Sequence, residues 1–206
     1  MKRILVVVLI LCCTVSIQAA DTAAAGIKGA LQAGIGAANV AGGPEFGLSY
    51  QVFTLQATGL YFPSKWATVI ADFSYGLPSS YEYKHDGDTD EVKAQSSYLD
   101  GMVGVYKTFS DGGFVYLGAG ATVGFGVLEV TNSDGSSYEF DLKTSVGLVY
   151  GAGLALPITD AFMGFVNVRQ RFIKAELELE PDGTRTYDMS NSGMEMVIGL
   201  GWTFGS

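Results

Sequence analysis

The stretch GMEMVIGLGWTF, residues 193–204, alternates two kinds of residue along its whole length. Every second residue from Met194 to Phe204 is large and apolar, and the residues between them are smaller or polar. A period of two places the large apolar side chains on one face of a β-strand and the others on the opposite face. The stretch therefore predicts a strand that turns its apolar face to lipid and its small or polar face inward.

The same alternation recurs along the rest of the chain and predicts seven more strands. The composition agrees, because 28 glycines, five prolines and only 16% charged residues disfavour a helical bundle. The predicted strands cover approximately residues 26–38, 46–61, 66–83, 95–108, 114–130, 137–156 and 161–178, and the eighth ends the chain.

Tight turns alternate with polar connections between these strands. The tight turns are expected at residues 62–65, 110–113 and 157–160, and the polar connections at 40–44, 84–93, 132–135 and 181–183. The stretch 84–93 is the most polar of the chain, and we expect it to be an exposed loop and the main contact surface. Within the second strand the apolar phase slips near Val52, which predicts a β-bulge there.

The beginning of the chain has the pattern of a secretory signal peptide. Lys2 and Arg3 precede an apolar run over residues 4–15, and small residues follow up to Ala20. An apolar run of this length is too short to span a membrane as a helix. We expect residues 1–20 to be a signal peptide that is cleaved after Ala19 or Ala20, and residues 21–206 to form one barrel domain.

The strand number, the alternation of turns with polar connections and the ending GLGWTF at 199–204 resemble a family of small bacterial outer-membrane proteins. This family includes the OmpA transmembrane domain, OmpX and the opacity proteins, and the resemblance covers nearly all of the chain after residue 20. It implies an all-β fold, namely an eight-stranded antiparallel up-and-down transmembrane β-barrel. It also implies a location in the outer membrane of a Gram-negative-type bacterium, with outer-membrane lipid around the barrel.

The same resemblance implies a role for the aromatic residues at the end of the last strand. In the family, the barrel assembly machinery reads a terminal aromatic residue during biogenesis. Trp202 and Phe204 are therefore the expected C-terminal assembly signal. Gly205 and Ser206 follow Phe204, whereas in the family the aromatic residue usually comes last.

The inward face of the predicted strands carries a set of charged and amide residues. The lumen of an eight-stranded barrel is only wide enough for side chains to fill it. Counted from the tight turns, these residues fall at one height, and pairing of the last two strands places Glu195 beside Arg169 and Arg171. We expect an ion network that closes the lumen, because an unpaired buried charge costs several kcal/mol. The members of this charged belt are Asp72, Asp100, Asn167, Arg169, Arg171 and Glu195.

Catalytic, metal and cofactor motifs are weak in this chain. His85 lies among acidic residues, but the remaining positions of a calcium loop are missing. Ser79, Ser80 and Asp86 are near His85 in sequence only, so we predict no catalytic site, no metal site and no cofactor. The glycines at 118–124 and 151–153 are not followed by a helix, so we expect them to make room inside the barrel rather than bind phosphate.

These features predict an outer-membrane barrel with a filled lumen. The resemblance implies an envelope-structural or surface-interaction role, in adhesion or resistance, with surface partners bound through the outer loops. The alternative is a small passive channel for small solutes, and a third class is a soluble lipocalin-like carrier, which would place the charged set outside. An excess of 21 acidic over 12 basic residues argues against a nucleic-acid partner.

Overall fold

The computed structural model describes residues 28–41, 49–85, 88–110, 112–178, 186–190 and 192–205. The predicted signal peptide and the predicted turn at 181–183 lie outside these residues, as does most of the connection predicted at 40–44. The described residues contain no helix long and apolar enough to cross a membrane. They form the strands β1 (Gly29–Ala41), β2 (Ser49–Tyr61), β3 (Ala67–Gly76), β4 (Ser79–His85), β5 (Asp88–Thr108), β6 (Phe114–Thr131), β7 (Ser137–Pro157), β8 (Phe162–Phe172), β9 (Lys174–Glu178), β10 (Thr186–Ser190) and β11 (Ser192–Phe204).

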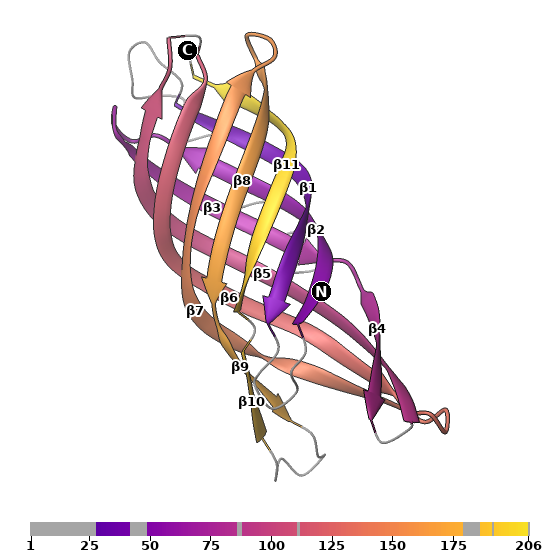
Figure 1. Cartoon of the computed structure of the whole chain (residues 1–206). Coiled ribbons are helices and arrows are strands. Elements are labelled where there is room, and N and C mark those ends of the chain that lie inside the picture. The colour runs from indigo at the N-terminus through magenta and orange to yellow at the C-terminus, as the bar shows by residue number, and fades with distance from the viewer. Residues whose placement is uncertain are drawn as a thin grey trace.

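The strands close into one antiparallel barrel (Figure 1). The order is β10-β9-β7-β6-β5-β3-β2-β1-β11-β8, and β8 also pairs with β7, which completes the ring. Three of the eleven strands continue another strand after a short interruption: β4 continues β3, β9 continues β8, and β11 continues β10. The chain therefore runs along the barrel eight times, once for each strand of an eight-stranded barrel. The predicted eight-stranded antiparallel barrel is confirmed.

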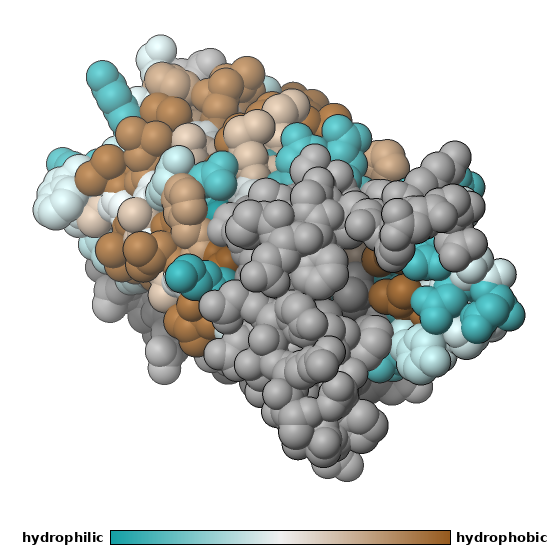
Figure 2. Space-filling view, turned by 60° about the horizontal axis from the view of Figure 1, so that its bottom comes forward, coloured by the Kyte–Doolittle hydropathy of each residue, from teal (hydrophilic) through white to brown (hydrophobic). Residues whose placement is uncertain are grey.

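Apolar side chains cover the outside of the wall and polar side chains face the lumen. Phe53, Val103 and Val146 are among the most exposed, at 70%, 70% and 72%, whereas Gln32 and Thr122 are buried. Figure 2 shows apolar side chains crowded over the barrel wall. An apolar outside is the reverse of a soluble carrier, so the lipocalin-like alternative is wrong.

The bulge predicted near Val52 is wrong. Strands β1 and β2 pair without a register shift from Gly29 opposite Tyr61 to Ala41 opposite Ser49. Val52 keeps the phase of the strand and packs inside the barrel against Ala38, so an inward apolar residue needs no change of register there. The irregularity instead lies between β6 and β7, where the register shifts between Gly124 and Gly126.

The loop predicted at 84–93 is also wrong, because most of this stretch is paired. Strand β4 pairs with β5 from Ser79 opposite Ala94 to His85 opposite Asp88. Val92 and Ala94 are buried on the inner face and alternate with polar residues. This period of two is typical of a β-strand, but the high polarity of the stretch obscured it. The β4–β5 and β6–β7 hairpins project beyond the ends of β1 and β2, as Figure 1 shows.

The tip of the β6–β7 hairpin is the turn predicted at 132–135. Gly135 has a φ of 85°, a left-handed conformation that glycine adopts without strain. Asp134 Oδ1 accepts hydrogen bonds from the hydroxyl of Ser136 at 2.6 Å and from its backbone N–H at 2.8 Å. These hydrogen bonds hold the pKa of Asp134 below its usual range.

An apolar cluster, which was not predicted from the sequence, fills the lumen at the end of the barrel that carries the tight turns. The ring of Phe62 lies 4.2 Å from that of Tyr106 and 5.3 Å, edge to face, from that of Phe114. The buried members of this apolar cluster are Ala30, Leu60, Phe62, Ile70, Met102, Phe114, Tyr116, Val149, Ala155, Met163, Phe165 and Val197.

Inward glycines leave space for the large side chains of the lumen. A Cβ atom on Gly153 would collide with the ring of Tyr116 and with Oδ1 of Asn167, whereas one on Gly101, which faces outward, would meet nothing within 4 Å.

We expect Gly153→Ala to lower the free energy of unfolding by about 1–3 kcal/mol. The control Gly101→Ala should leave it unchanged or raise it by up to about 1 kcal/mol. Urea unfolding of the refolded barrel in detergent, followed by tryptophan fluorescence, measures both, and equal losses would contradict this packing.

Candidate functional site

All six residues of the predicted charged belt lie inside the barrel, and each is at most 2% exposed. Strand β8 contributes three of them at every second position, so that their side chains all point inward. The acids come from three other strands. Glu195 lies on β11, which pairs with β8, and is opposite Arg169, whereas Asp72 of β3 and Asp100 of β5 are opposite each other on strands that do not pair with β8.

Arg171 binds two of the three acids. Its Nη2 lies 2.7 Å from Asp100 Oδ2, its Nε lies 3.1 Å from both oxygens of Asp100, and its Nη1 lies 2.7 Å from Glu195 Oε2. Ser74 donates its hydroxyl hydrogen to the other oxygen of Glu195 at 2.5 Å. The guanidinium also lies over the ring of Tyr98, 4.5 Å from the centroid. A charge-assisted, multiply bonded contact of this kind is among the strongest that buried side chains make.

Arg169 is bound mainly by neutral groups. Its Nη2 donates to the hydroxyl oxygen of Tyr116 at 2.8 Å and lies 3.3 Å from Asp72 Oδ2. Its Nη1 donates to the backbone carbonyl oxygens of Ala152 and Val168, each at 3.3 Å. Arg169 therefore links β8 to β3, β6 and β7 within the lumen.

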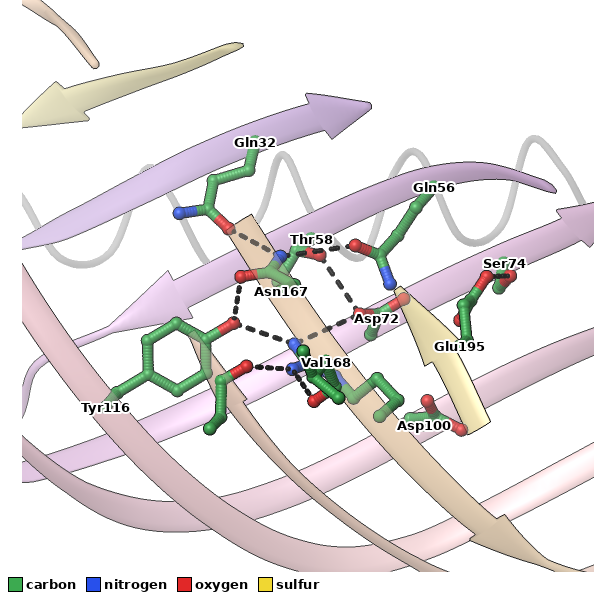
Figure 3. A network of polar contacts seen from close by, with 12 residues as sticks. Gln32, Gln56, Thr58, Asp72, Ser74, Asp100, Tyr116, Asn167, Val168 and Glu195 are labelled. Atoms are coloured by element: carbon green, nitrogen blue, oxygen red, sulfur yellow. Dashed lines mark hydrogen bonds and ion pairs between the residues drawn. The ribbon is translucent and has the colours of Figure 1, made fainter. Parts of the chain in front are cut away.

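Asn167 connects the charged residues to a group of amides (Figure 3). Tyr116 donates its hydroxyl hydrogen to Asn167 Oδ1 at 2.8 Å. Asn167 Nδ2 in turn donates to Oε1 of Gln32 at 3.0 Å and to Oε1 of Gln56 at 3.2 Å. The polar layer thus reaches from β1 and β2 to β6 and β8.

Tyr116 is the member of this layer that sequence reasoning missed. It precedes the inward Gly118 by two residues, so extending that inward file would have placed it in the lumen. Gln32, Gln56 and Thr58 lie on the inner face, as the period of two predicts, but nothing in the sequence indicates which of them would contact the belt.

The weak catalytic and metal motifs do not come together. Strand β4 separates Ser79 from His85 by six residues, about 20 Å at the rise of a β-strand, and Asp86 lies outside the described residues. A serine and a histidine at this separation cannot act as nucleophile and base. In the described part of the chain, no three or more His, Cys, Asp and Glu side chains are grouped to hold a metal ion.

The two aromatic residues of the expected assembly signal lie at the end of β11. Trp202 is 50% exposed, and its ring centroid is 6.4 Å from that of Phe204. The ring of Phe204 packs against Gly29 of β1, at the seam where the first and last strands pair.

The family model for the outer membrane protein beta-barrel domain matches residues 5–204. The chain belongs to this family. The location in the outer membrane that the sequence predicted is therefore confirmed, and lipid surrounds the barrel.

Solved structures of outer-membrane barrels share the fold. Neisserial surface protein A is 17% identical, with 86% of this chain and 97% of that chain covered and a TM-score of 0.51. OprG from Pseudomonas aeruginosa is 16% identical, with coverage of 88% and 98% and a TM-score of 0.55. Ail of Yersinia pestis, in complex with the heparin analogue sucrose octasulfate, is 17% identical, with coverage of 86% and 100% and a TM-score of 0.50. The comparison with curated proteins finds no match.

The contacts of Arg171 predict a large effect of its removal. Arg171→Ala leaves Asp100 and Glu195 buried without a counter-charge, so we expect the free energy of unfolding to fall by about 3–5 kcal/mol. Lys93→Ala is the control, because the Lys93–Glu129 pair is 3.8 Å long and about 40% exposed, and its loss should cost about 1 kcal/mol or less. Urea midpoints of the refolded variants measure both changes. A loss below about 1 kcal/mol for Arg171→Ala would show that the belt is not a tight ion network.

Proposed function

We propose that this outer-membrane barrel does not conduct solutes and acts at the cell surface, in an envelope-structural or surface-interaction role. The single observation that carries the proposal is the occupation of the lumen by two successive layers of side chains. One layer is the charged belt with its amides, and the other is the apolar cluster at the tight-turn end.

The charged belt supports closure because its members bind one another across the lumen. Arg171 of β8 reaches Asp100 of β5 and Glu195 of β11, and Arg169 reaches Asp72 of β3. An ion passing through this layer would have to displace contacts as short as 2.7 Å between fully buried charges. Breaking one such contact costs several kcal/mol.

The apolar cluster supports closure in a different way. Phe62, Phe114 and Met163 are buried in the lumen next to the tight turns and offer no polar group to a hydrated solute. A solute that passed the belt would have to shed its water here, which is costly for any polar molecule. Removal of the belt alone would therefore leave the lumen closed.

The projecting hairpins are the part of the molecule that we propose as the contact surface. Pairs of like charge lie opposite each other on their strands, Glu82 with Glu91 and Glu129 with Glu139. The β4–β5 hairpin has two basic residues, Lys84 and Lys93, and Lys93 is opposite Glu129. The related Ail barrel was solved with a heparin analogue, which is a polyanion. The acidic face of these hairpins repels a polyanion, so we propose a surface partner of different chemistry.

Biogenesis completes the proposal. We propose that residues 1–20 are removed as a signal peptide and that the barrel assembly machinery reads Trp202 and Phe204. The packing of Phe204 against Gly29 supports this role. Phe204 lies where the last strand pairs with the first, and the assembly machinery would have to recognise the last strand to close the barrel there.

Conductance in a planar bilayer tests the closed lumen. We expect the wild-type chain to be silent, because both layers are in place. The double variant Arg169→Ala and Phe114→Ala, with one opening in each layer, should show discrete current steps, and each single variant should remain silent because one layer is still intact. Folding of every variant is checked by gel migration with and without boiling. Steady steps from the wild type would contradict the proposal and establish a small passive channel with the belt as its selectivity ring.

Shortening the β4–β5 hairpin tests the contact surface. Replacement of residues 81–92 by Asn-Gly keeps Ser80 opposite Lys93 and makes a tight hairpin, so the barrel should remain folded. We expect adhesion of cells that display this variant to fall toward that of cells without the protein. Replacement of residues 131–137 by Asn-Gly shortens the β6–β7 hairpin and leaves β4 and β5 intact, so a comparison of the two variants tells which hairpin carries the contact. Unchanged adhesion with the first variant would rule out the β4–β5 hairpin as the contact surface.

A further inference from the structure

The buried charges of the lumen do not balance. Among the side chains whose burial the structure describes, the buried acidic and basic ones are three carboxylates and two guanidiniums. With all five ionised, this set carries one excess negative charge, which is unfavourable in a poorly hydrated space. These five residues are Asp72, Asp100, Glu195, Arg169 and Arg171.

Asp100 and Glu195 have no oxygen left at which a further cation could bind. Both oxygens of Asp100 accept hydrogen bonds from Arg171. Glu195 accepts one from Arg171 and one from the hydroxyl of Ser74. Each oxygen of these two carboxylates therefore has a donor.

Asp72 is the carboxylate that keeps an oxygen without a donor. Its Oδ2 accepts a hydrogen bond from Thr58 at 3.0 Å and lies 3.3 Å from Arg169, the longest of the three buried ion pairs. Arg169 in turn is shared with the hydroxyl of Tyr116 and with two backbone carbonyls. The other oxygen, Oδ1, is fully buried and has no hydrogen-bond partner. Figure 3 shows one side of this carboxylate directed at Thr58 while its other oxygen makes no marked contact.

The strand register makes the site more electronegative. Asp72 of β3 and Asp100 of β5 are directly opposite each other, and both point into the lumen. Like charges at opposite positions of neighbouring strands destabilise a sheet. A positive charge bound at Asp72 would remove this repulsion and the net charge together.

We propose that the belt binds one monovalent cation at Oδ1 of Asp72, either a proton or an alkali-metal ion. A single positive charge brings the net charge of the five side chains to zero, whereas a divalent ion would leave one excess positive charge. A carboxylate oxygen is a hard ligand and suits either occupant. As a proton, the cation comes from solvent and forms an O–H bond at Oδ1, which then becomes a hydrogen-bond donor.

The groups that set the charge around Asp72 come from every neighbouring part of the lumen. Strand β2 contributes only neutral side chains there, such as Thr58. The charged and titratable residues facing it are Arg169 and Arg171 of β8, Asp100 and Tyr98 of β5, Tyr116 of β6 and Glu195 of β11.

The test compares the wild-type chain, refolded in detergent, with Asp72→Asn, which keeps the shape of the side chain and removes the excess charge. Glu91→Gln is the matched control, since it removes an exposed carboxylate from the projecting hairpin. Urea unfolding is measured from about pH 5 to pH 8, a range in which the carboxyl of an unfolded chain is ionised. Each pH is repeated in sodium, potassium and tetramethylammonium chloride at one ionic strength.

The two occupants give different results. If a proton is bound, the folded state holds a proton that the unfolded state has released, so stability falls as the pH rises through this range. The unfolding constant of the wild type then increases by up to about tenfold per pH unit. If an alkali ion is bound, the wild-type midpoint is higher in sodium or potassium than in tetramethylammonium. Asp72→Asn abolishes whichever dependence the wild type shows, and Glu91→Gln retains it.

Identical pH and salt dependence in the wild type and Asp72→Asn would overturn the proposal. Should Asp72→Asn fail to fold, the wild type alone decides between the outcomes. Carbon-13 NMR of aspartate-labelled barrel then reports whether one buried carboxyl carries a proton or responds to sodium or potassium. An aspartate spectrum in which every carboxyl is ionised and insensitive to alkali ions would equally overturn it.

Discussion

The contact of Arg171 with Asp100 and Glu195 is the interaction on which the interior of this barrel depends. Eight strands enclose a space only as wide as a few side chains, so every charge that points inward is withdrawn from water. A guanidinium can satisfy two carboxylates at once because its donors form a rigid planar fork. The distances of 2.7 Å on both sides indicate that this fork is fully used. Arg169, Asn167 and the amides are then arranged around a charge that is already compensated.

The wall and the lumen place opposite demands on the same strands. Large apolar side chains face lipid, while inward positions alternate between bulky side chains and glycines that leave room for them. Gly153 shows the rule at one point, because the space above it is taken by Tyr116 and Asn167. The lumen therefore contains distinct apolar and polar layers at different heights, and the projecting hairpins carry the exposed charge.

Sequence periodicity predicted the faces of the strands well, because a period of two depends only on the geometry of a single strand. It placed all six belt residues inside, among them Asp72, whose three-dimensional neighbours come from distant parts of the chain. It failed in two places: a polar stretch was interpreted as a loop, and an inward apolar residue was interpreted as a bulge. Residues 84–85 and 88–93 pair in a hairpin although this stretch is highly charged, and Val52 is an inward apolar residue. The contacts of Tyr116 and of the apolar cluster were not predicted, because their partners are set by the closure of the ring, which no single strand encodes.

The position of Glu195 on the last strand has a consequence for how the barrel folds. Glu195 reaches Arg171 only when β11 has paired with β8, and the same strand closes the ring against β1. Until then Glu195 lacks the guanidinium that it binds, and a chain with an open seam leaves this carboxylate without a counter-charge. Closure of the sheet and completion of the ion network are therefore one event. Partly assembled barrels should be rare at equilibrium, and the fold should form and melt as a single cooperative unit.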